Sequence, residues 1–295
     1  MIGVNRLMLL EIKGIEKRYG DKKALKQLDI QLSKGIYGLL GPNGAGKSTL
    51  MKLICMLIKP TKGKILYDSV DIRKNKKDFL KKVGYMPQQH CLYPEFKVEE
   101  YLYYIGALKG MSKNVTKESA EKLLKSLKLW DIREQRIRTL SGGMKQRLMF
   151  AQAMLDNPDI VILDEPTAGL DPKKRIEMRN IIAEYAKDRI ILIATHVVSD
   201  VELISDQILL LDQGELLAQN SVEELNKQLK GKVVEVEADN KIEILKDNYM
   251  ISSMYKKEGK IYAKLLLRDN DELPFGSSPV YPNLEDVYLH YFGRE

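Results

Sequence analysis

The sequence has little cysteine and no long hydrophobic run. Its 295 residues include only two cysteines, Cys55 and Cys91, which lie far apart and without the spacing of metal ligands. This scarcity argues against a disulfide framework and for a reducing compartment. The densest apolar runs, such as Ile190–Ala194, have only the length of a strand, whereas a membrane-spanning helix needs roughly 18 apolar residues. The first residues, Met1–Arg6, also lack the charged, apolar and small-residue order of a secretion signal. We therefore expect a cytosolic protein that reaches a membrane only through a partner.

The composition is that of an ordinary globular protein, with 44% hydrophobic and 30% charged residues. The length suffices for one large domain and one small one. The net charge of +7 is compatible with nucleic acid or an anionic membrane surface as a partner. Most basic residues are dispersed, and the local cluster within residues 73–82 is typical of a solvated lysine-rich helix face. Charge alone therefore assigns no partner.

The first half of the chain predicts a strand, a glycine loop and a helix in succession. Residues 7–40 contain short alternating apolar runs with turn signals, which predict a small, partly antiparallel sheet leading into a core strand at Ile36–Leu40. A glycine-rich turn follows. The next apolar spacing predicts a helix that starts near Lys47 and stops before Pro60.

Three helices are expected between residues 98 and 155. Glycines near 106–110 separate the first two. The predicted apolar face of the first helix consists of Tyr101, Leu102, Ile105 and Leu108. The corresponding face of the second consists of Leu123, Leu124, Leu127 and Trp130. The third begins at Ser141, whose hydroxyl suits the N-cap position.

The second half changes character near residue 228. Two almost continuous apolar runs, Ile160–Leu163 and Ile190–Ile193, predict strands of a parallel sheet covered on both faces. Later apolar residues alternate with charged ones, and a helix is expected from Asn283 to Phe292. We predict a large α/β domain over residues 7–228, with a helical subdomain at about 90–155, and a small α+β domain over residues 229–295.

One stretch fits the phosphate-binding pattern G-x-x-x-x-G-K-[ST] in full. Its glycines let backbone N–H groups curl around phosphate oxygens, and the following helix points its positive end at them. Lys47 is expected to reach the β- and γ-phosphates, Ser48 to bind Mg²⁺, and Thr49 to lie beside them. The pattern comprises Gly41, Pro42, Asn43, Gly44, Ala45, Gly46, Lys47 and Ser48.

The apolar run at residues 160–163 ends in two carboxylates, Asp164 and Glu165. Acids at the carboxyl edge of a parallel strand lie where α/β sheets bind ligands. Asp164 would hold Mg²⁺ and Glu165 would polarise a water for attack on the γ-phosphate. Alone, an apolar strand followed by Asp-Glu is common, but the nearby phosphate-binding loop favours the functional interpretation.

A second anion-binding pattern starts the helix at residue 141. Ser141, Gly142 and Gly143 combine a hydroxyl with exposed N–H groups at the positive end of a helix. By itself the pattern is typical of a plain N-cap. With one phosphate-binding loop in the chain, a second anion site requires a second phosphate group or a second subunit.

Residues 140–147, Leu-Ser-Gly-Gly-Met-Lys-Gln-Arg, resemble the signature sequence of ATP-binding cassette (ABC) proteins. The other motifs of that family follow in its order over residues 7–220. Tyr19 is similar to the aromatic residue that stacks on adenine, and Gln88 to the glutamine that senses the γ-phosphate, its metal and the permease. Asp171 resembles the aspartate that reaches across the subunit interface, and His196 the switch histidine.

The resemblance implies a P-loop NTPase fold with a mixed, largely parallel sheet, a small antiparallel β subdomain and a helical subdomain. It implies ATP and Mg²⁺ as cofactors, with the metal near Ser48, Gln88 and Asp164. It further implies that Glu165, His196 and Gln88 are the catalytic residues, with Glu165 as the base and His196 orienting water and phosphate. ATP would be bound between two head-to-tail subunits, and a homodimer is more plausible than a heterodimer because the site residues are complete.

The resemblance also implies a separate membrane permease as partner, no nucleic acid, and a peripheral location on the inner face of the cell membrane. Residues 98–102 and 282–288 are similar to subunits that serve exporters of drugs and antimicrobial peptides. Met144 departs from the family, which most often has glutamine there. Methionine cannot donate the hydrogen bonds that glutamine offers.

Three alternatives stay open. A soluble cassette ATPase acting on ribosomes or DNA usually has two cassettes or a coiled-coil insert, and this chain shows one phosphate-binding loop and no heptad insert. A P-loop metabolic kinase would have no use for residues 140–147. A regulatory module would bind nucleotide without turnover, which an ATPase measurement distinguishes.

Overall fold

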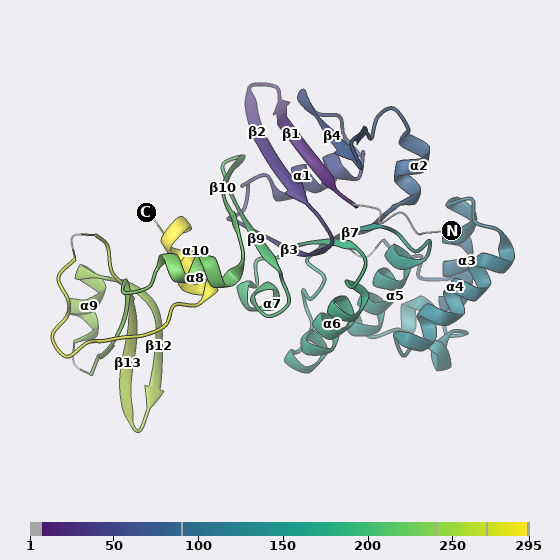
Figure 1. Cartoon of the computed structure of the whole chain (residues 1–295). Helices are drawn as coiled ribbons and strands as arrows, with labels where there is room; N and C mark the ends of the chain where they lie inside the picture. The colour runs from purple at the N-terminus through teal and green to yellow at the C-terminus, as the bar shows by residue number, and fades with distance from the viewer. Residues whose placement is uncertain (1–7, 90, 240, 270, 294–295) are drawn as a thin grey trace, which may run out of the picture. The chain divides into compact units, whose positions relative to one another are not determined.

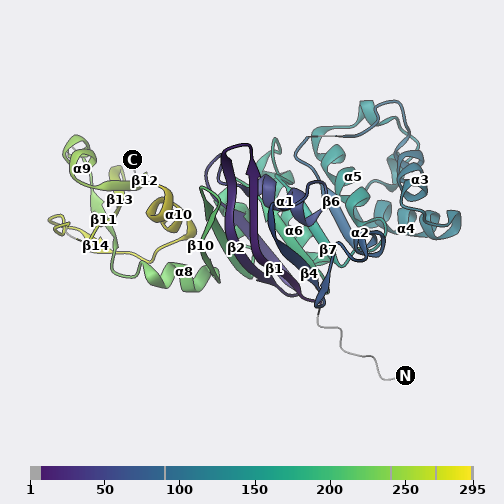
Figure 2. The same ribbon diagram turned by 90° about the horizontal axis from the view of Figure 1, so that it is seen from above.

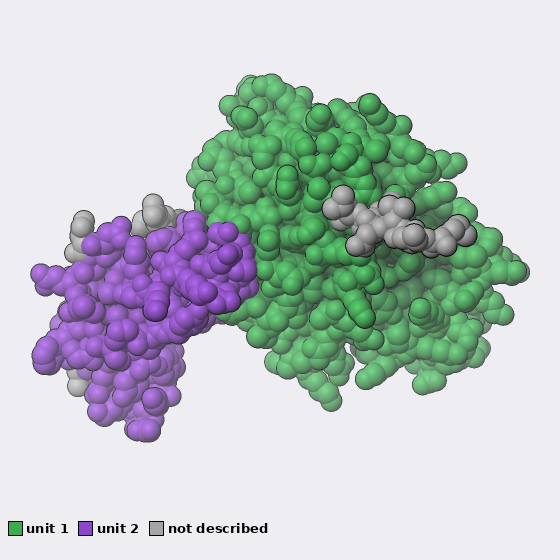
Figure 3. Space-filling model, viewed as in Figure 1, with its two compact units in different colours: residues 1–219 green, residues 220–295 purple. Residues whose placement is uncertain are grey.

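The computed structural model describes residues 8–89, 91–239, 241–269 and 271–293. The segment Met1–Arg6, where no secretion signal is expected, lies outside these ranges. The chain divides into two units, residues 1–219 and 220–295 (Figure 3). The division falls between Gln219 and Asn220, at the end of strand β10 (Glu215–Asn220), so helix α8 (Val222–Gln228) belongs to the second unit, whereas the sequence-based boundary lies after residue 228.

The core of unit 1 is a six-stranded sheet with the order β10-β9-β3-β8-β7-β6. Strand β3 pairs in parallel with β8 and β9, and β7 pairs in parallel with β8 and β6. Figure 1 labels β3, β7, β9 and β10 of this sheet. Every residue of β8 is buried, as expected for a strand covered on both faces. The parallel strands predicted from the two apolar runs are thus confirmed. The bounds are β3 Gly35–Leu40, β6 Val83–Met86, β7 Ile160–Asp164, β8 Ile190–Ala194 and β9 Gln207–Asp212.

Unit 1 also contains an antiparallel sheet with the order β2-β1-β4-β5. Figure 2 shows β2, β1 and β4 of this sheet side by side. Its inward apolar side chains share one hydrophobic cluster with helix α1 and strands β3, β7, β8 and β9. The predicted helix after the glycine loop is confirmed as α1, Lys47–Ile54. The strands are β1 Leu10–Tyr19, β2 Lys22–Leu32, β4 Lys62–Tyr67 and β5 Val70–Asp71.

Helices α3 (Val98–Leu108), α4 (Lys113–Ser126) and α5 (Gly142–Met154) pack on one another and form the predicted helical subdomain (Figure 1). Two details of the prediction are wrong. Helix α4 ends at Ser126, because Lys128 adopts a positive φ of 55° that an α-helix cannot accommodate, and Trp130 lies in a short 3₁₀ turn. Leu108 is 67% exposed, so it does not belong to the buried face of α3.

The remaining helices of unit 1 are α2 (Lys76–Lys81), α6 (Pro172–Tyr185) and α7 (Val198–Glu202). The basic cluster within residues 73–82 lies on α2 and on the residues that flank it. The basic side chains are mostly exposed there, as expected for a solvated face.

Unit 2 is a small α+β fold. Its antiparallel sheet has the order β12-β13-β11-β14, and its core includes Val234, Ala263 and Leu265. The helix predicted to start at Asn283 is confirmed as α10, with Asn283 as its N-cap. In the described ranges of the chain no helix is long and apolar enough to cross a bilayer. The other bounds are β11 Val233–Glu237, α9 Ile242–Asn248, β12 Met250–Lys257, β13 Lys260–Leu266, β14 Ser278–Pro279 and α10 Leu284–Phe292.

Candidate active site

The phosphate-binding loop connects β3 to α1 and depends on its glycines. Gly41 has a φ of 155°, and a Cβ there would lie 2.0 Å from the carbonyl oxygen of Leu211. Gly46 has a φ of 111° and occupies the N-cap of α1, where it offers no capping side chain. The N–H groups of the first helical turn are therefore left for an anionic ligand to bind at the positive end of the helix.

Lys47 is half-buried at the start of α1. Its ammonium group donates to the carbonyl oxygens of Gly41 and Pro42, the latter at 3.0 Å. Burial lowers the pKa of Lys47, and the charges of Glu165 and Asp164 oppose that shift. Because Lys47 is a cation that lies against the loop, it can neutralise phosphate oxygens held by the same loop.

Asp164 and Glu165 stand at the carboxyl end of β7. The pKa of Asp164 is raised to about 6, first by burial and second by the charge of the nearby Glu165, while Lys47 and Lys52 act in the opposite direction. Glu165 is 8% exposed and adopts a left-handed φ of 52°, which is rare for a residue with a side chain. Residues held in such conformations cluster at active sites, ligand clamps and switch regions.

Glu165 is joined to the end of the neighbouring strand β8. One oxygen, Oε1, accepts from the backbone N–H of His196 at 3.0 Å and lies 2.9 Å from Nδ1 of its ring. The other oxygen, Oε2, accepts from the hydroxyl of Thr195 at 3.1 Å. The imidazole of His196 is itself 69% exposed. Adjacent parallel strands thus place a buried carboxylate and an accessible imidazole together.

A cavity of about 310 Å³ lies over these groups, within the usual size range of small-molecule sites. Tyr19 lines it, and Lys17 Nζ lies 4.9 Å from the centroid of its ring, as in a cation–π contact. Lys22 and Ala24 also line the cavity and are absent from the sequence-based prediction. The sequence offers only one indication of these two residues, which is that they lie close to Tyr19 along the chain. The predicted residues that line the cavity are Tyr19, Asn43, Gly44, Ala45, Gly46, Lys47, Ser48, Thr49, Gln88, Asp164, Glu165 and His196.

Six predicted residues do not line this cavity: Gly41 and Pro42 at the start of the loop, and Ser141, Gly142, Gly143 and Asp171 elsewhere in the chain. Ser141 is exposed and caps α5 by accepting a long hydrogen bond of 3.4 Å from the N–H of Met144. Asp171 caps α6, accepts from the N–H of Lys174 at 3.0 Å and forms an ion pair of 2.7 Å with its ammonium group, which lowers the pKa of Asp171. A Cβ on Gly143 would lie 2.8 Å from Cδ of Lys174. The signature sequence and the start of α6 therefore form a second surface, which we call the signature patch (Ser141–Met144, Asp171 and Lys174).

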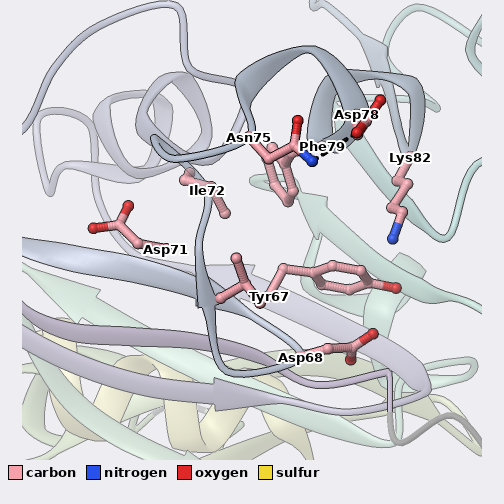
Figure 4. Close-up of a pocket in the computed structure, with 9 residues that line it drawn as sticks. Tyr67, Asp68, Asp71, Ile72, Asn75, Asp78, Phe79 and Lys82 are labelled. Atoms are coloured by element: carbon pink, nitrogen blue, oxygen red, sulfur yellow. Dashed lines mark hydrogen bonds between the residues drawn. The ribbon is translucent and has the colours of Figure 1, made fainter.

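Another cavity, of about 250 Å³, lies between β4 and α2 (Figure 4). Its acidic residues are already engaged, because Arg73 donates to Asp71 and Asn75 donates to Asp78. Lys82 Nζ lies 4.8 Å from the ring centroid of Tyr67. These pairings leave no convergent set of reactive groups comparable with that of the phosphate-binding loop.

The known proteins most informative about this site are transport ATPases. The family described as ABC transporter matches residues 25–168. The Nod factor export ATP-binding protein I of Bradyrhizobium diazoefficiens is 32% identical over 98% of this chain and 97% of its own length. This chain belongs to the ATP-binding subunits of ABC transporters. The linearmycin resistance ATP-binding protein of Bacillus subtilis is 34% identical over 77% of this ABC subunit and 73% of its own length.

Solved cassettes share the fold of this ABC subunit. An ATP-binding subunit of an ABC transporter aligns with a TM-score of 0.67 and 29% identity, over 75% of this chain and 92% of its own. A dimeric cassette in a post-hydrolysis state, bound to ADP and Pi, aligns with a TM-score of 0.64 and 25% identity, over 72% and 98% of the two chains. The predicted P-loop fold and the predicted nucleotide-binding ATPase of an ABC transporter are therefore confirmed.

Proposed function

We propose that this ABC subunit hydrolyses ATP in a head-to-tail homodimer and thereby drives export through a separate membrane permease. The observation that carries the proposal is the division of the predicted site into two surfaces on one chain. The phosphate-binding loop, both carboxylates and His196 meet at one cavity, whereas the signature patch lies outside it. Two copies arranged head to tail would bring each patch to the cavity of the other.

In this proposal the loop from Gly41 to Thr49 and the ammonium group of Lys47 hold the phosphates of ATP. Tyr19 stacks on the adenine through the face of its ring opposite Lys17. Ser141, Gly142 and Gly143 of the second copy bind the γ-phosphate with a hydroxyl and helix-end N–H groups. Loss of the γ-phosphate removes contacts from the closed dimer selectively, which is the differential binding that a two-state motor requires.

Ser48, Gln88 and Asp164 suit Mg²⁺, which takes one or two carboxylates together with phosphate oxygens. All three line the same cavity, and Asp164 supplies the carboxylate. When bound, the ion would neutralise charge that develops on the phosphates. Glu165 is positioned as the general base for the attacking water, and His196, held at its Oε1, orients water and phosphate.

Export is supported by the relatives, of which one is named for Nod factor export and another for linearmycin resistance. A permease partner places this subunit on the cytoplasmic face of the membrane. We assign the cassette to unit 1 and an accessory role to unit 2, and we expect no nucleic-acid partner. Inward movement of solute in vesicles that contain the assembled transporter would contradict the export direction.

The first experiment is the oligomeric state of Glu165→Gln with and without ATP–Mg²⁺, measured by size exclusion with light scattering. Slow hydrolysis should hold the closed dimer, so a dimer that forms only with nucleotide supports two composite sites. Glu165→Gln combined with Lys47→Ala is the matched control, because it should lose the nucleotide and remain monomeric. Nucleotide binding without dimerisation would refute the homodimer and indicate a different second cassette.

A further inference from the structure

A buried ionic network joins the segment after β7 to the segment after β8. Asp200, in the first turn of α7, is only 3% exposed. Its Oδ2 accepts from the hydroxyl of Thr167 at 2.5 Å, and its Oδ1 accepts from NH1 of Arg179 at 3.0 Å. Buried charges require such partners, because the transfer of an unpaired carboxylate out of water costs on the order of several kcal/mol.

This network runs beside the contact between Glu165 and His196. Thr167 follows Glu165 along the chain with only Pro166 between them, and Asp200 lies on the helix that follows His196. The two segments are therefore linked twice, once by the Glu165 carboxylate and once by Asp200. Neither Thr167 nor Asp200 lines the cavity, so neither is placed to touch a nucleotide bound there.

The carboxylate of Asp200 also connects both segments to helix α6. Arg179 and Arg175 belong to α6, and that helix is capped by Asp171 of the signature patch. Arg175 Nε lies 3.8 Å from Oδ2 of Asp200, which is within ion-pair range but too long for a hydrogen bond. Among the described residues this buried Nε has no hydrogen-bond partner. A shift of α6 by about 1 Å would complete the bond.

We infer that Asp200 is a positioning residue for ATP hydrolysis: it holds the His196 segment against Glu165 and ties both to the helix that begins at Asp171. The inference rests on the proposed roles of Glu165 and His196. Asp200 acts through these residues, so its loss should slow the chemical step and leave nucleotide affinity unchanged.

The sharpest test is the pair Thr167→Val and Thr167→Ser in the full chain, assayed for ATPase activity with ATP–Mg²⁺. Valine has nearly the shape of threonine and removes only the hydroxyl that binds Asp200. We expect Thr167→Val to lower kcat about tenfold with KM for ATP changed less than about twofold, which is the signature of an interaction made in the transition state. Thr167→Ser keeps the hydroxyl and should retain kcat within about twofold.

A His196→Ala background separates positioning from general structure. If Asp200 acts through His196, Thr167→Val should change kcat of the His196→Ala variant by less than about twofold, because interactions in one network are not additive. Asp200→Asn should reproduce the loss, and adding Thr167→Val to it should cost nothing more. Full additivity in either combination would overturn the inference.

The outcomes distinguish this inference from the proposed function. A slow His196→Ala variant with a fully active Thr167→Val variant would overturn only the role of Asp200. A His196→Ala variant with the parental kcat would overturn both, because no switch histidine would remain for Asp200 to position. A third outcome is a fall in kcat that is accompanied by a lower thermal midpoint and is not recovered in Thr167→Ser. That outcome would show that the network serves only the stability of the fold, and it would contradict the inference as well.

Discussion

Each unit of this protein buries a carboxylate, and the two are held in different ways. Asp286 of unit 2 is 0% exposed and is surrounded by fixed partners: Lys264 at 2.6 Å, the backbone N–H of Asn283 at 2.8 Å and the hydroxyl of Ser252. Glu165 of unit 1 is nearly as buried, but it lines a cavity. Its partners are a hydroxyl, a backbone amide and the exposed ring of His196.

The difference lies in the partners, since burial is nearly equal. A lysine salt bridge and a helix cap hold Asp286 in one position, where it ties α10 to β12 and β13. The exposed ring of His196 has room to rotate away from Glu165 and leave an oxygen for water. Burial alone therefore does not identify a catalytic carboxylate. In the proposed function, Glu165 is distinguished from Asp286 by a cavity and an exposed partner in addition to burial.

The largest expected effect is that of Glu165→Gln. The amide keeps the size of the side chain but cannot accept a proton, and a general base contributes on the order of 10²–10⁴-fold to a rate. We expect kcat for ATP to fall about 10³-fold, with little change in the thermal midpoint of unit 1. Steady-state hydrolysis and calorimetry on the same preparation measure both quantities. A kcat within tenfold of the parent would remove Glu165 from the role of base.

The matching change in unit 2 is Asp286→Ala, which leaves the ammonium group of Lys264 buried without its partner. Breaking a buried pair in this way costs about 3–5 kcal/mol. We expect the free energy of unfolding of unit 2 to fall by about 3 kcal/mol, at the lower end because Lys264 is partly exposed. Hydrogen exchange at the amides of β12 and β13 reports the loss locally. The double variant Asp286→Ala, Lys264→Met is the control and should recover part of the stability.

The comparison also shows what the sequence could predict. The phosphate-binding loop, the Asp164–Glu165 pair and the helix near Asn283–Phe292 are contiguous stretches, so short-range patterns suffice to find them. The links from Glu165 to Thr195, from Thr167 to Asp200 and from Asp286 to Lys264 join separate elements, and they depend on strand order and register. The end of α4 was missed for a different reason, since the apolar spacing continues to Trp130 while the backbone turns at Lys128.

A smaller effect should follow from pH. Because the pKa of Asp164 is raised to about 6, this carboxyl gains its proton as the pH falls through 6 and then cannot bind a cation. We expect the apparent affinity of the ATP-bound protein for Mg²⁺ to decrease about tenfold per pH unit below that value. Titrations with Mg²⁺ at several pH values between pH 8 and pH 5, in steps of about one pH unit, measure this affinity. Free ATP, titrated in parallel, is the control for protonation of its phosphates. An affinity that tracks free ATP throughout would contradict a raised pKa at Asp164.

The smallest effects concern the hydroxyl partner of each carboxylate. Thr195→Val removes the donor to Oε2 of Glu165, and Ser252→Ala removes the donor to Oδ1 of Asp286. A hydrogen bond to a charged group contributes about 1.5–3 kcal/mol, and less when other donors remain, so each change should cost about 1 kcal/mol. The cost should appear in different quantities. In Thr195→Val the carboxylate of Glu165 is held less firmly, so kcat should fall by about fivefold. Ser252→Ala should lower only the protection of β12 and β13 from hydrogen exchange. If Thr195→Val changed exchange protection alone, Glu165 would be held in the same structural manner as Asp286, and the distinction between the two carboxylates would fail.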